Sequence, residues 1–323
     1  MSALTGVSKH AGRWLIALLV LPAVLPLSYA VDPNTPILND GRIGPLVIPD
    51  VAEAAVKGTM PFAGTGILTA DVLAGAMKVI LTPEELRTYR PRGGGGPESV
   101  VGLDTRVKVY PNTYPYRATA LVTFKQGSGN YICSAWFYGP DILATAGHCV
   151  HTGGPGGSWS TNVKVYPGYS TSGTPYAAQY LGSVTGWTNS SNPQFDYGII
   201  DIGTNVGTSK GWFGFWWQSA SLNNLPSVIN GYPGDKGGST QWVGVDYVRV
   251  TQTNQVFYRT DTYGGESGSP VWHDRPPGSA SCSNGPCAYA IHAYGTNSAG
   301  NNGGTRINQS VFNNLISWKN SLP

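Results

Sequence analysis

The chain has 323 residues, and its 20 basic and 17 acidic residues give a net charge of +3 at pH 7. The basic residues are scattered singly, which argues against a nucleic-acid-binding protein. Glycine is abundant, with 44 residues, charged residues are few, and Tyr and Trp are frequent, which is typical of a loop-rich β protein.

The beginning of the chain has the pattern of a secretory signal. Lys9 and Arg13 precede an apolar run from Trp14 to Leu27, which is too short to span a bilayer comfortably. Small residues at Ser28 and Ala30 stand at the positions that a signal peptidase reads. We therefore predict a signal peptide over residues 1–30, an extracellular protein, and no membrane association once the signal is removed.

Residues 31–98 differ in composition from the remainder. They are rich in proline, include a predicted helix near residues 70–78, and end close to four consecutive glycines, Gly93 to Gly96. Such a stretch is flexible and exposed, as a processing site requires. We interpret residues 31–98 as a propeptide and residues 99–323 as the mature domain.

The mature region alternates short apolar runs with clusters of Gly, Pro and Asn. This pattern is typical of an all-β sandwich or barrel, with strands expected near residues 118–124, 163–166, 197–202, 227–232 and 247–251. Near the C-terminus, Val311, Leu315 and Ile316 fall on one helical face, with Asn308 or Ser310 as a cap. A closing helix is therefore expected.

Three motifs contain residues suited to nucleophilic chemistry. The run Gly-Glu-Ser-Gly-Ser-Pro, residues 265–270, can present Ser267 on a tight turn, while His148 and Asp196 lie upstream. A serine hydroxyl is a poor nucleophile near neutral pH, so a histidine must take its proton and a buried carboxylate must orient that histidine. The chain order His, Asp, Ser therefore indicates a catalytic triad.

These motifs resemble those of the chymotrypsin-like serine endopeptidases, and in particular the secreted bacterial glutamyl endopeptidase group. The resemblance spans residues 99–323. It implies an all-β fold of two six-stranded antiparallel barrels, with the active site in the cleft between them and a seam near residues 203–225. It also implies polypeptide substrates and chemistry that needs no cofactor or metal. We expect a monomer whose own propeptide is a further partner.

The resemblance assigns roles that the motifs alone leave open. It selects His148 as the base over His151, which we expect to be an exposed loop residue. It selects Asp196 as the acid over Asp201, which we expect at the surface end of a strand. The backbone N–H groups of Gly265 and of the candidate serine itself would form the oxyanion hole.

All four cysteines lie in the mature region, and an even number suits an oxidising exterior. Their spacings do not match the paired ligands of a zinc site. The simplest interpretation is two disulfides, Cys133–Cys149 beside the candidate histidine and Cys282–Cys287 across a small hairpin.

Two patterns favour different substrates. Asp261, six residues before Ser267, stands where trypsin-like enzymes place the aspartate that binds Lys or Arg. Thr262 and His292 instead match the glutamyl endopeptidases, in which these residues bind a substrate carboxylate. We expect cleavage after Glu and less readily Asp, with Asp261 directed away from the pocket. Cleavage after Lys or Arg is one alternative, and a non-catalytic binding protein of the same fold is another, although such proteins usually lack a triad residue.

The distribution of glutamate in the sequence favours cleavage after Glu. Residues 99–323 contain one glutamate, Glu266, against eight aspartates, as expected of an enzyme that cleaves after exposed glutamates, although a general scarcity of charged residues is another explanation.

Glu98 directly precedes the proposed mature start, so we predict self-processing between Glu98 and Ser99, with Arg92–Gly93 as the competing site. Glu266 stands where trypsin-like enzymes have Asp and the glutamyl group an amide. The role of the Ser99 amine, at the substrate pocket or paired with an acid, is left open.

Overall fold

The computed structural model describes residues 31–44, 57–77, 81–92, 100–170 and 173–323. The predicted signal peptide and the proposed processing site at Glu98 and Ser99 lie outside these residues. No helix in the described part of the chain is long and apolar enough to cross a membrane.

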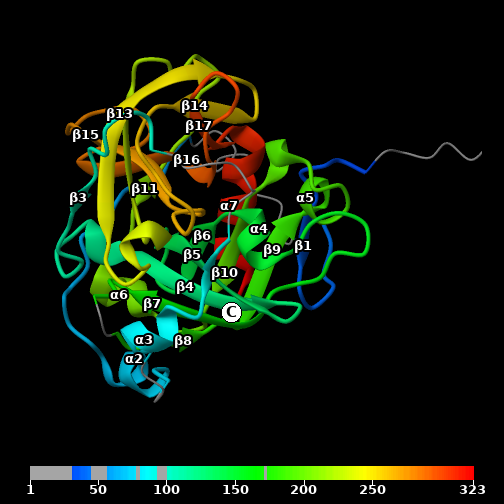
Figure 1. Cartoon of the computed structure of the whole chain (residues 1–323), viewed down its shortest axis with the longest axis vertical. Helices are drawn as coiled ribbons and strands as arrows, with labels where there is room; N and C mark the ends of the chain where they lie inside the picture. Colours follow the sequence, from blue (N-terminus) through cyan, green and yellow to red (C-terminus); the bar gives the residue numbers. More distant parts are fainter. Residues whose placement is uncertain (1–30, 45–56, 78–80, 93–99, 171–172) are drawn as a thin grey trace, which may run out of the picture. The chain divides into compact units, whose positions relative to one another are not determined.

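Short strands build a first sheet in the order β1-β9-β10-β6-β5-β4-β7-β8, with β2 paired to β5 (Figure 1). Its strands are β1 (Pro36–Leu38), β2 (Arg90–Pro91), β4 (Thr119–Gln126), β5 (Gly129–Phe137), β6 (Ile142–Thr145), β7 (Thr161–Pro167), β8 (Tyr176–Ala177), β9 (Tyr180–Val184) and β10 (Gly198–Asp201).

The second sheet has the order β11-β16-β15-β12-β13-β14-β17, with β3 paired to β13 and a further pairing between β16 and β17. Its strands are β3 (Val107–Lys108), β11 (Gly214–Phe215), β12 (Pro226–Gly231), β13 (Trp242–Thr251), β14 (Gln255–Tyr258), β15 (Pro270–Arg275), β16 (Gly285–Tyr294) and β17 (Asn302–Arg306). Because β17 also pairs with β16, strands β12 to β17 close on themselves as a barrel.

Among the described residues, each sheet contains six strands of four or more residues, in agreement with the expected pair of six-stranded barrels. The additional strands are two or three residues long, and two of them, β1 and β2, come from residues before 99. Two pairings, β2 with β5 and β11 with β16, are parallel, and the other strand pairings are antiparallel. The five strands expected from the sequence correspond to β4, β7, β10, β12 and β13.

Helices are short except at the C-terminus. They are α2 (Ala70–Ala74), α3 (Pro83–Leu86), α4 (Gly147–Val150), α5 (Thr185–Thr188), α6 (Val206–Lys210) and α7 (Gln309–Ser321), with 3-10 turns η1 (Tyr116–Ala118), η2 (Pro193–Phe195) and η3 (Gly234–Lys236). Helix α2 ends earlier than the predicted residue 78. Gly75 caps it, with its N–H bonded to the Asp71 carbonyl, and glycine is a poor helix former.

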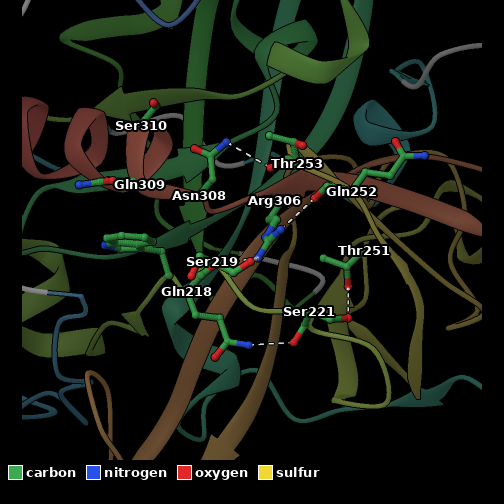
Figure 2. A pocket seen from close by; sticks show the side chains of 11 residues that line it. Gln218, Ser219, Ser221, Thr251, Gln252, Thr253, Arg306, Asn308, Gln309 and Ser310 are labelled. Atoms are coloured by element: carbon green, nitrogen blue, oxygen red, sulfur yellow. Dashed lines mark hydrogen bonds between the residues drawn. The ribbon is translucent and has the colours of Figure 1, made fainter.

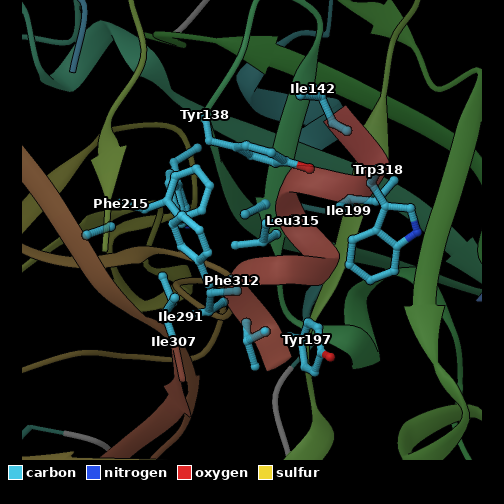
Figure 3. Packing of buried hydrophobic residues seen from close by; sticks show 14 of the residues in the cluster. Tyr138, Ile142, Tyr197, Ile199, Phe215, Ile291, Ile307, Phe312, Leu315 and Trp318 are labelled. Atoms are coloured by element: carbon cyan, nitrogen blue, oxygen red, sulfur yellow. The ribbon is translucent and has the colours of Figure 1, made fainter. Parts of the chain in front are cut away.

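The predicted closing helix is confirmed as α7, and Asn308 rather than Ser310 caps it, because the Asn308 side chain accepts a hydrogen bond from the Val311 N–H at 3.0 Å. Helix α7 packs against side chains from both sheets, including Ile199 of β10 and Phe215 of β11 (Figure 3). Burying each such large apolar side chain stabilises the fold by roughly 1.5–3 kcal/mol.

Both disulfides that the sequence predicts are present. Cys133 of β5 is joined to Cys149 of α4, with 6.2 Å between their Cα atoms, and Cys282 is joined to Cys287 of β16. The first therefore ties the central strand of the first sheet to the short helix that carries His148.

Candidate active site

His148 and Asp196 lie side by side in the structure. The His148 Nδ1 is 2.7 Å from Asp196 Oδ2, and the His148 backbone N–H donates to Asp196 Oδ1 at 2.8 Å. Asp196 is fully buried at the end of η2, and His148 is buried in α4. A methyl group added at Gly147 would lie 3.0 Å from Asp196 Oδ1. Because Gly147 has no side chain, the Asp196 carboxylate can approach both the ring Nδ1 and the backbone nitrogen of His148.

Ser267 lies on a glycine-rich turn that leads into β15. Gly265 and Gly268 both have positive φ, 103° and 90°, a conformation that favours glycine. A Cβ at Gly268 would lie 2.1 Å from the Ser134 carbonyl oxygen, so this position has no room for a side chain. The Gly268 N–H donates to the His292 carbonyl, and the Ser267 Oγ lies 3.5 Å from the Ala293 carbonyl, which seats the turn on β16.

The amides of this turn are suited to binding an anion. Among the described residues, no acceptor takes a hydrogen bond from the N–H of Gly265 or of Ser267. Backbone N–H groups that are fixed by a rigid turn and free of protein partners can stabilise a developing oxyanion.

The competing residues are engaged elsewhere. His151 accepts a hydrogen bond at Nδ1 from the Gly153 N–H and packs its ring against Trp159. Asp201 accepts one from the Gly203 N–H at 2.8 Å, and burial, followed by the charge of Asp141, raises its pKa to about 7. Both residues are buried, so the expectation that they lie at the surface is wrong. Asp201 lies on β10 between β6 and β9, and His151 packs against Trp159, and the local sequence does not reveal these contacts.

Asp261 is bound to the segment of residues 101–105. Its carboxylate accepts hydrogen bonds from the Val101 N–H at 2.8 Å, from the Thr105 N–H at 2.9 Å and from the Thr105 hydroxyl at 2.7 Å. These three bonds occupy both carboxylate oxygens.

Thr262 and His292 are buried polar residues next to the glycine-rich turn that contains Ser267. Thr262 Oγ1 has no hydrogen-bond partner among the described residues. His292, on β16, has its Nδ1 2.7 Å from the Tyr258 hydroxyl. Burial, and then the charge of His148, lowers the pKa of His292 to about 3, so this imidazole is neutral near pH 7. An unpartnered buried hydroxyl is costly unless a ligand satisfies it.

Comparison with known proteins places this arrangement in a family. No family model matches the chain. The glutamyl endopeptidase of Bacillus licheniformis is 37% identical to it over 79% of this chain and 80% of its own length. This chain belongs to the glutamyl endopeptidase group of chymotrypsin-like serine proteases.

Two solved structures share the fold of this serine endopeptidase, and a further relative is similar in sequence. A solved Glu endopeptidase in complex with MPD aligns with a TM-score of 0.58 and 27% identity over 68% of this chain and 99% of its own. The protease Anisep from Arthrobacter nicotinovorans, with 18% identity over 67% of this chain and 99% of its own and a TM-score of 0.55, shows the fold alone. The extracellular metalloprotease of Bacillus subtilis is 32% identical over 97% of this chain and 99% of its own length.

The name of that last relative raises the question of a metal. In the described part of this protease, one group of potential metal-binding atoms lies close together, from Cys133, His148 and Cys149. The two cysteine sulfurs form a disulfide and are not thiolates, and the His148 Nδ1 is engaged by Asp196. These residues therefore do not fit a metal ion.

A segment from before residue 99 lies against the candidate base. Strand β2 pairs with β5, and the Arg92 N–H donates to the Ile132 carbonyl at 3.0 Å. The Arg92 carbonyl oxygen lies 3.2 Å from His148 Nε2, and the Arg92 guanidinium lies over the Tyr131 ring. A small pocket of about 80 Å³ lies beside His148, and Arg92 forms part of its lining.

A larger pocket of about 490 Å³ lies elsewhere in this protease, beside α7 and the end of β13 (Figure 2). Its centre is Arg306, whose guanidinium donates to the backbone carbonyls of Gln218, Ala220 and Gln252. No triad candidate lines this pocket. Because Arg306 already binds backbone groups, we assign it a structural role.

Sequence reasoning missed two residues that contact the site. Tyr258 orients His292, and Arg106 faces Glu266 across 160 positions of sequence. Both contacts depend on how distant strands come together, so no local pattern indicates them.

Proposed function

We propose that this serine endopeptidase cleaves on the carboxyl side of Glu, and less readily Asp, through a Ser267-His148-Asp196 triad. The observation that carries the proposal is the buried His148–Asp196 pair near the glycine-rich turn of Ser267, whose carbonyl oxygen lies 3.8 Å from Sγ of Cys149, the residue after His148. This arrangement of a base held by a buried carboxylate is what a serine nucleophile needs.

In the proposed mechanism Ser267 Oγ attacks the scissile carbonyl carbon while His148 Nε2 takes the hydroxyl proton. Asp196 holds the Nδ1–H and stabilises the imidazolium that forms. The negative charge on the carbonyl oxygen is bound by the amides of Gly265 and Ser267. His148 then returns the proton to the leaving amine, and water releases the acyl group by the same steps.

Thr262 and His292 are the proposed partners of the substrate carboxylate. Among the described residues the buried Thr262 hydroxyl has no hydrogen-bond partner, and Tyr258 engages Nδ1 of His292, so Nε2 is the nitrogen that we assign to the ligand. A substrate without a carboxylate would leave these buried polar groups unpaired, which discriminates strongly. The alternative preference for Lys or Arg would need the Asp261 carboxylate, which is already bound by Val101 and Thr105.

The position of the glutamates also supports this specificity. Glu266, the single glutamate of residues 99–323, is completely buried. Glu84 and Glu85, in the segment before residue 99, are exposed. A mature enzyme that cleaves after glutamate would therefore offer itself no accessible site.

We further propose that the protease is secreted as a precursor in which residues 31–98 keep it latent. The Arg92 carbonyl oxygen lies 3.2 Å from His148 Nε2, the nitrogen that must take the Ser267 proton in the proposed mechanism, so this segment occupies the position that the nucleophile and substrate need. Removal of the segment, at Glu98–Ser99 in our proposal, frees the base.

Matched peptide substrates that differ only at P1, with Glu, Gln, Asp or Lys, test the specificity. We expect kcat/KM for Glu to exceed that for Gln by about 10⁴-fold, because Gln cannot reproduce the carboxylate contacts. In Thr262→Val this ratio should fall by at least about tenfold. Faster cleavage after Lys than after Glu would overturn the proposed pocket.

A further inference from the structure

Glu266 immediately precedes Ser267 and is completely buried, with 0% of its side chain exposed. Its Oε2 accepts a hydrogen bond from the Tyr263 N–H at 2.8 Å, and its own N–H donates to the Tyr263 carbonyl at 3.0 Å. These two bonds connect the ends of the turn that contains Gly265. The Glu266 side chain is thus part of the turn that presents the nucleophile and the oxyanion hole.

Arg106 is the cation that faces this carboxylate. Its Nη1 lies 3.5 Å from Glu266 Oε2 and 3.2 Å from Asp235 Oδ1. Its Nε and Nη2 each lie 2.9 Å from an oxygen of Asp104, and Lys236 also contacts Asp104 at 2.9 Å. The Arg106 side chain is completely buried. The planar guanidinium, with five donors in fixed directions, can hold three carboxylates at once.

Burial makes this arrangement sensitive to the loss of either partner. Burial raises the pKa of Glu266 to about 8 even though the positive charge of Arg106 acts against that shift, so the ionised form of this carboxyl group depends on Arg106. Removing one partner of a buried ion pair leaves an uncompensated charge and is strongly destabilising. A turn that contains such a charge would rearrange to expose it.

We propose that Arg106 is a positioning residue for catalysis, which acts through Glu266 to hold the Tyr263–Ser267 turn in its reactive shape. The inference rests on the proposed function, in which Ser267 is the nucleophile. Arg106 itself touches neither the substrate nor the reacting atoms.

The same contacts give Asp261 a role. Its carboxylate binds Val101 and Thr105, directly before Arg106, and so anchors the segment that carries the guanidinium. In the trypsin pattern a new N-terminal amine pairs with the acid before the nucleophile. Here an internal arginine occupies that place, so the turn has its cation before any cleavage at residue 98.

A double-mutant cycle tests this role. Arg106→Met removes the positive charge and keeps a side chain of similar length. Glu266→Gln removes the negative charge that faces Arg106, and the third variant combines both substitutions. We expect Arg106→Met to lower kcat by about 100-fold or more, because the oxyanion donors are displaced. Glu266→Gln alone should cost less than about fivefold, because the amide oxygen still accepts from Tyr263. The double variant should recover to within about tenfold of the wild type.

The readout is kcat per nucleophile, counted by labelling to completion with a fluorophosphonate. A purely structural arginine would lower the melting temperature and the yield but leave this kcat unchanged. Arg249→Met serves as the matched control, because Arg249 forms a surface pair with Asp246 and its loss should not alter kcat. If Arg106→Met does not accumulate, Arg106→Lys replaces it, with an expected loss of about tenfold that Glu266→Gln again reverses.

Two outcomes would overturn the inference. One is a wild-type kcat per labelled site in Arg106→Met or Arg106→Lys. The other is a double variant no better than the arginine variant alone. Ser267→Ala separates this from the proposed function, since a fully active Ser267→Ala would contradict the triad itself, whereas an inactive Ser267→Ala with a fully active arginine variant would contradict only the role of Arg106.

Discussion

Asp196 serves His148 twice, once through the ring and once through the backbone. Its two oxygens bind the His148 Nδ1 at 2.7 Å and the backbone N–H at 2.8 Å. The backbone bond holds the position of α4, whereas the ring bond fixes which nitrogen carries the proton. An isosteric substitution can separate these two effects.

Asp196→Asn should leave the fold intact and reduce kcat by about 10⁴-fold, because the amide can still accept from the backbone N–H but favours the wrong tautomer of His148. Circular dichroism and the melting temperature serve as controls for folding. A loss of less than about tenfold would show that the pair does not orient the base.

His292 leads to a prediction about pH. Its pKa is lowered to about 3, so between pH 4 and 8 it stays neutral in the folded enzyme. His292 should therefore add no deprotonation to the rise of kcat/KM with pH, and log kcat/KM should rise with a slope of 1. A slope near 2 in this range would mean that His292 also titrates there. Because His292 in the unfolded chain binds its proton near pH 6.5, the same shift lowers the free energy of unfolding, and so destabilises the fold, as pH falls from about 6.5 towards 3.

At the scale of elements, the site is assembled from short segments that larger strands hold in place. Helix α4 carries His148 and is joined to β5 by the Cys133–Cys149 disulfide. Strand β16 supports the turn around Ser267 through contacts with Gly268 and with the Ala293 carbonyl. The Cys282–Cys287 disulfide joins residues only five positions apart at the start of β16. The two disulfides should therefore differ in their effect on catalysis.

Removal of Cys133–Cys149 by a double substitution to alanine should lower the free energy of unfolding by about 3 kcal/mol, the value expected for a loop of this size. It should also reduce kcat, because α4 loses its tie to β5. The corresponding Cys282/Cys287 variant is the matched control, with a smaller loss of stability and near-normal kcat. Equal kcat in both variants would show that the first disulfide does not position His148.

Local sequence was informative for elements and motifs and uninformative for contacts between distant segments. The strands and the closing helix follow from short-range patterns, which leave its cap open between Asn308 and Ser310, and the Gly-Glu-Ser-Gly run around Ser267 is itself a local motif. Asp201 is flanked by β6 and β9, so its burial depends on how separate strands pair. The ion pair of Arg106 with Glu266, and the placement of Arg92 on His148, arise only when segments far apart in the chain meet, so no periodicity reveals them.

At the scale of the whole molecule, the segment before residue 99 is integrated into the first sheet. Strand β1 pairs with β9, and β2 pairs with β5 next to the candidate base. The proposed precursor is therefore blocked by its own backbone at His148. The Tyr263–Ser267 turn, by contrast, already faces an internal cation, Arg106, through Glu266.

A precursor that cannot be cleaved should reveal this latency. Glu98→Gln in the 31–323 chain should hydrolyse a Glu-containing peptide at least about 100-fold more slowly than the mature 99–323 form, because the Arg92 carbonyl engages the base. Intact mass must confirm that the precursor stays whole, which also excludes cleavage at Arg92–Gly93. Equal activity of the two forms would contradict the proposed block.

The most direct test of the proposed activity is the cleavage-site profile of the 99–323 form on a denatured protein mixture, read by mass spectrometry beside Ser267→Ala. We predict cuts after Glu, fewer after Asp, and none with the Ser267→Ala variant. Cuts mainly after Lys and Arg would contradict the assignment of Thr262 and His292 to the pocket. Undiminished cutting by Ser267→Ala would contradict the triad.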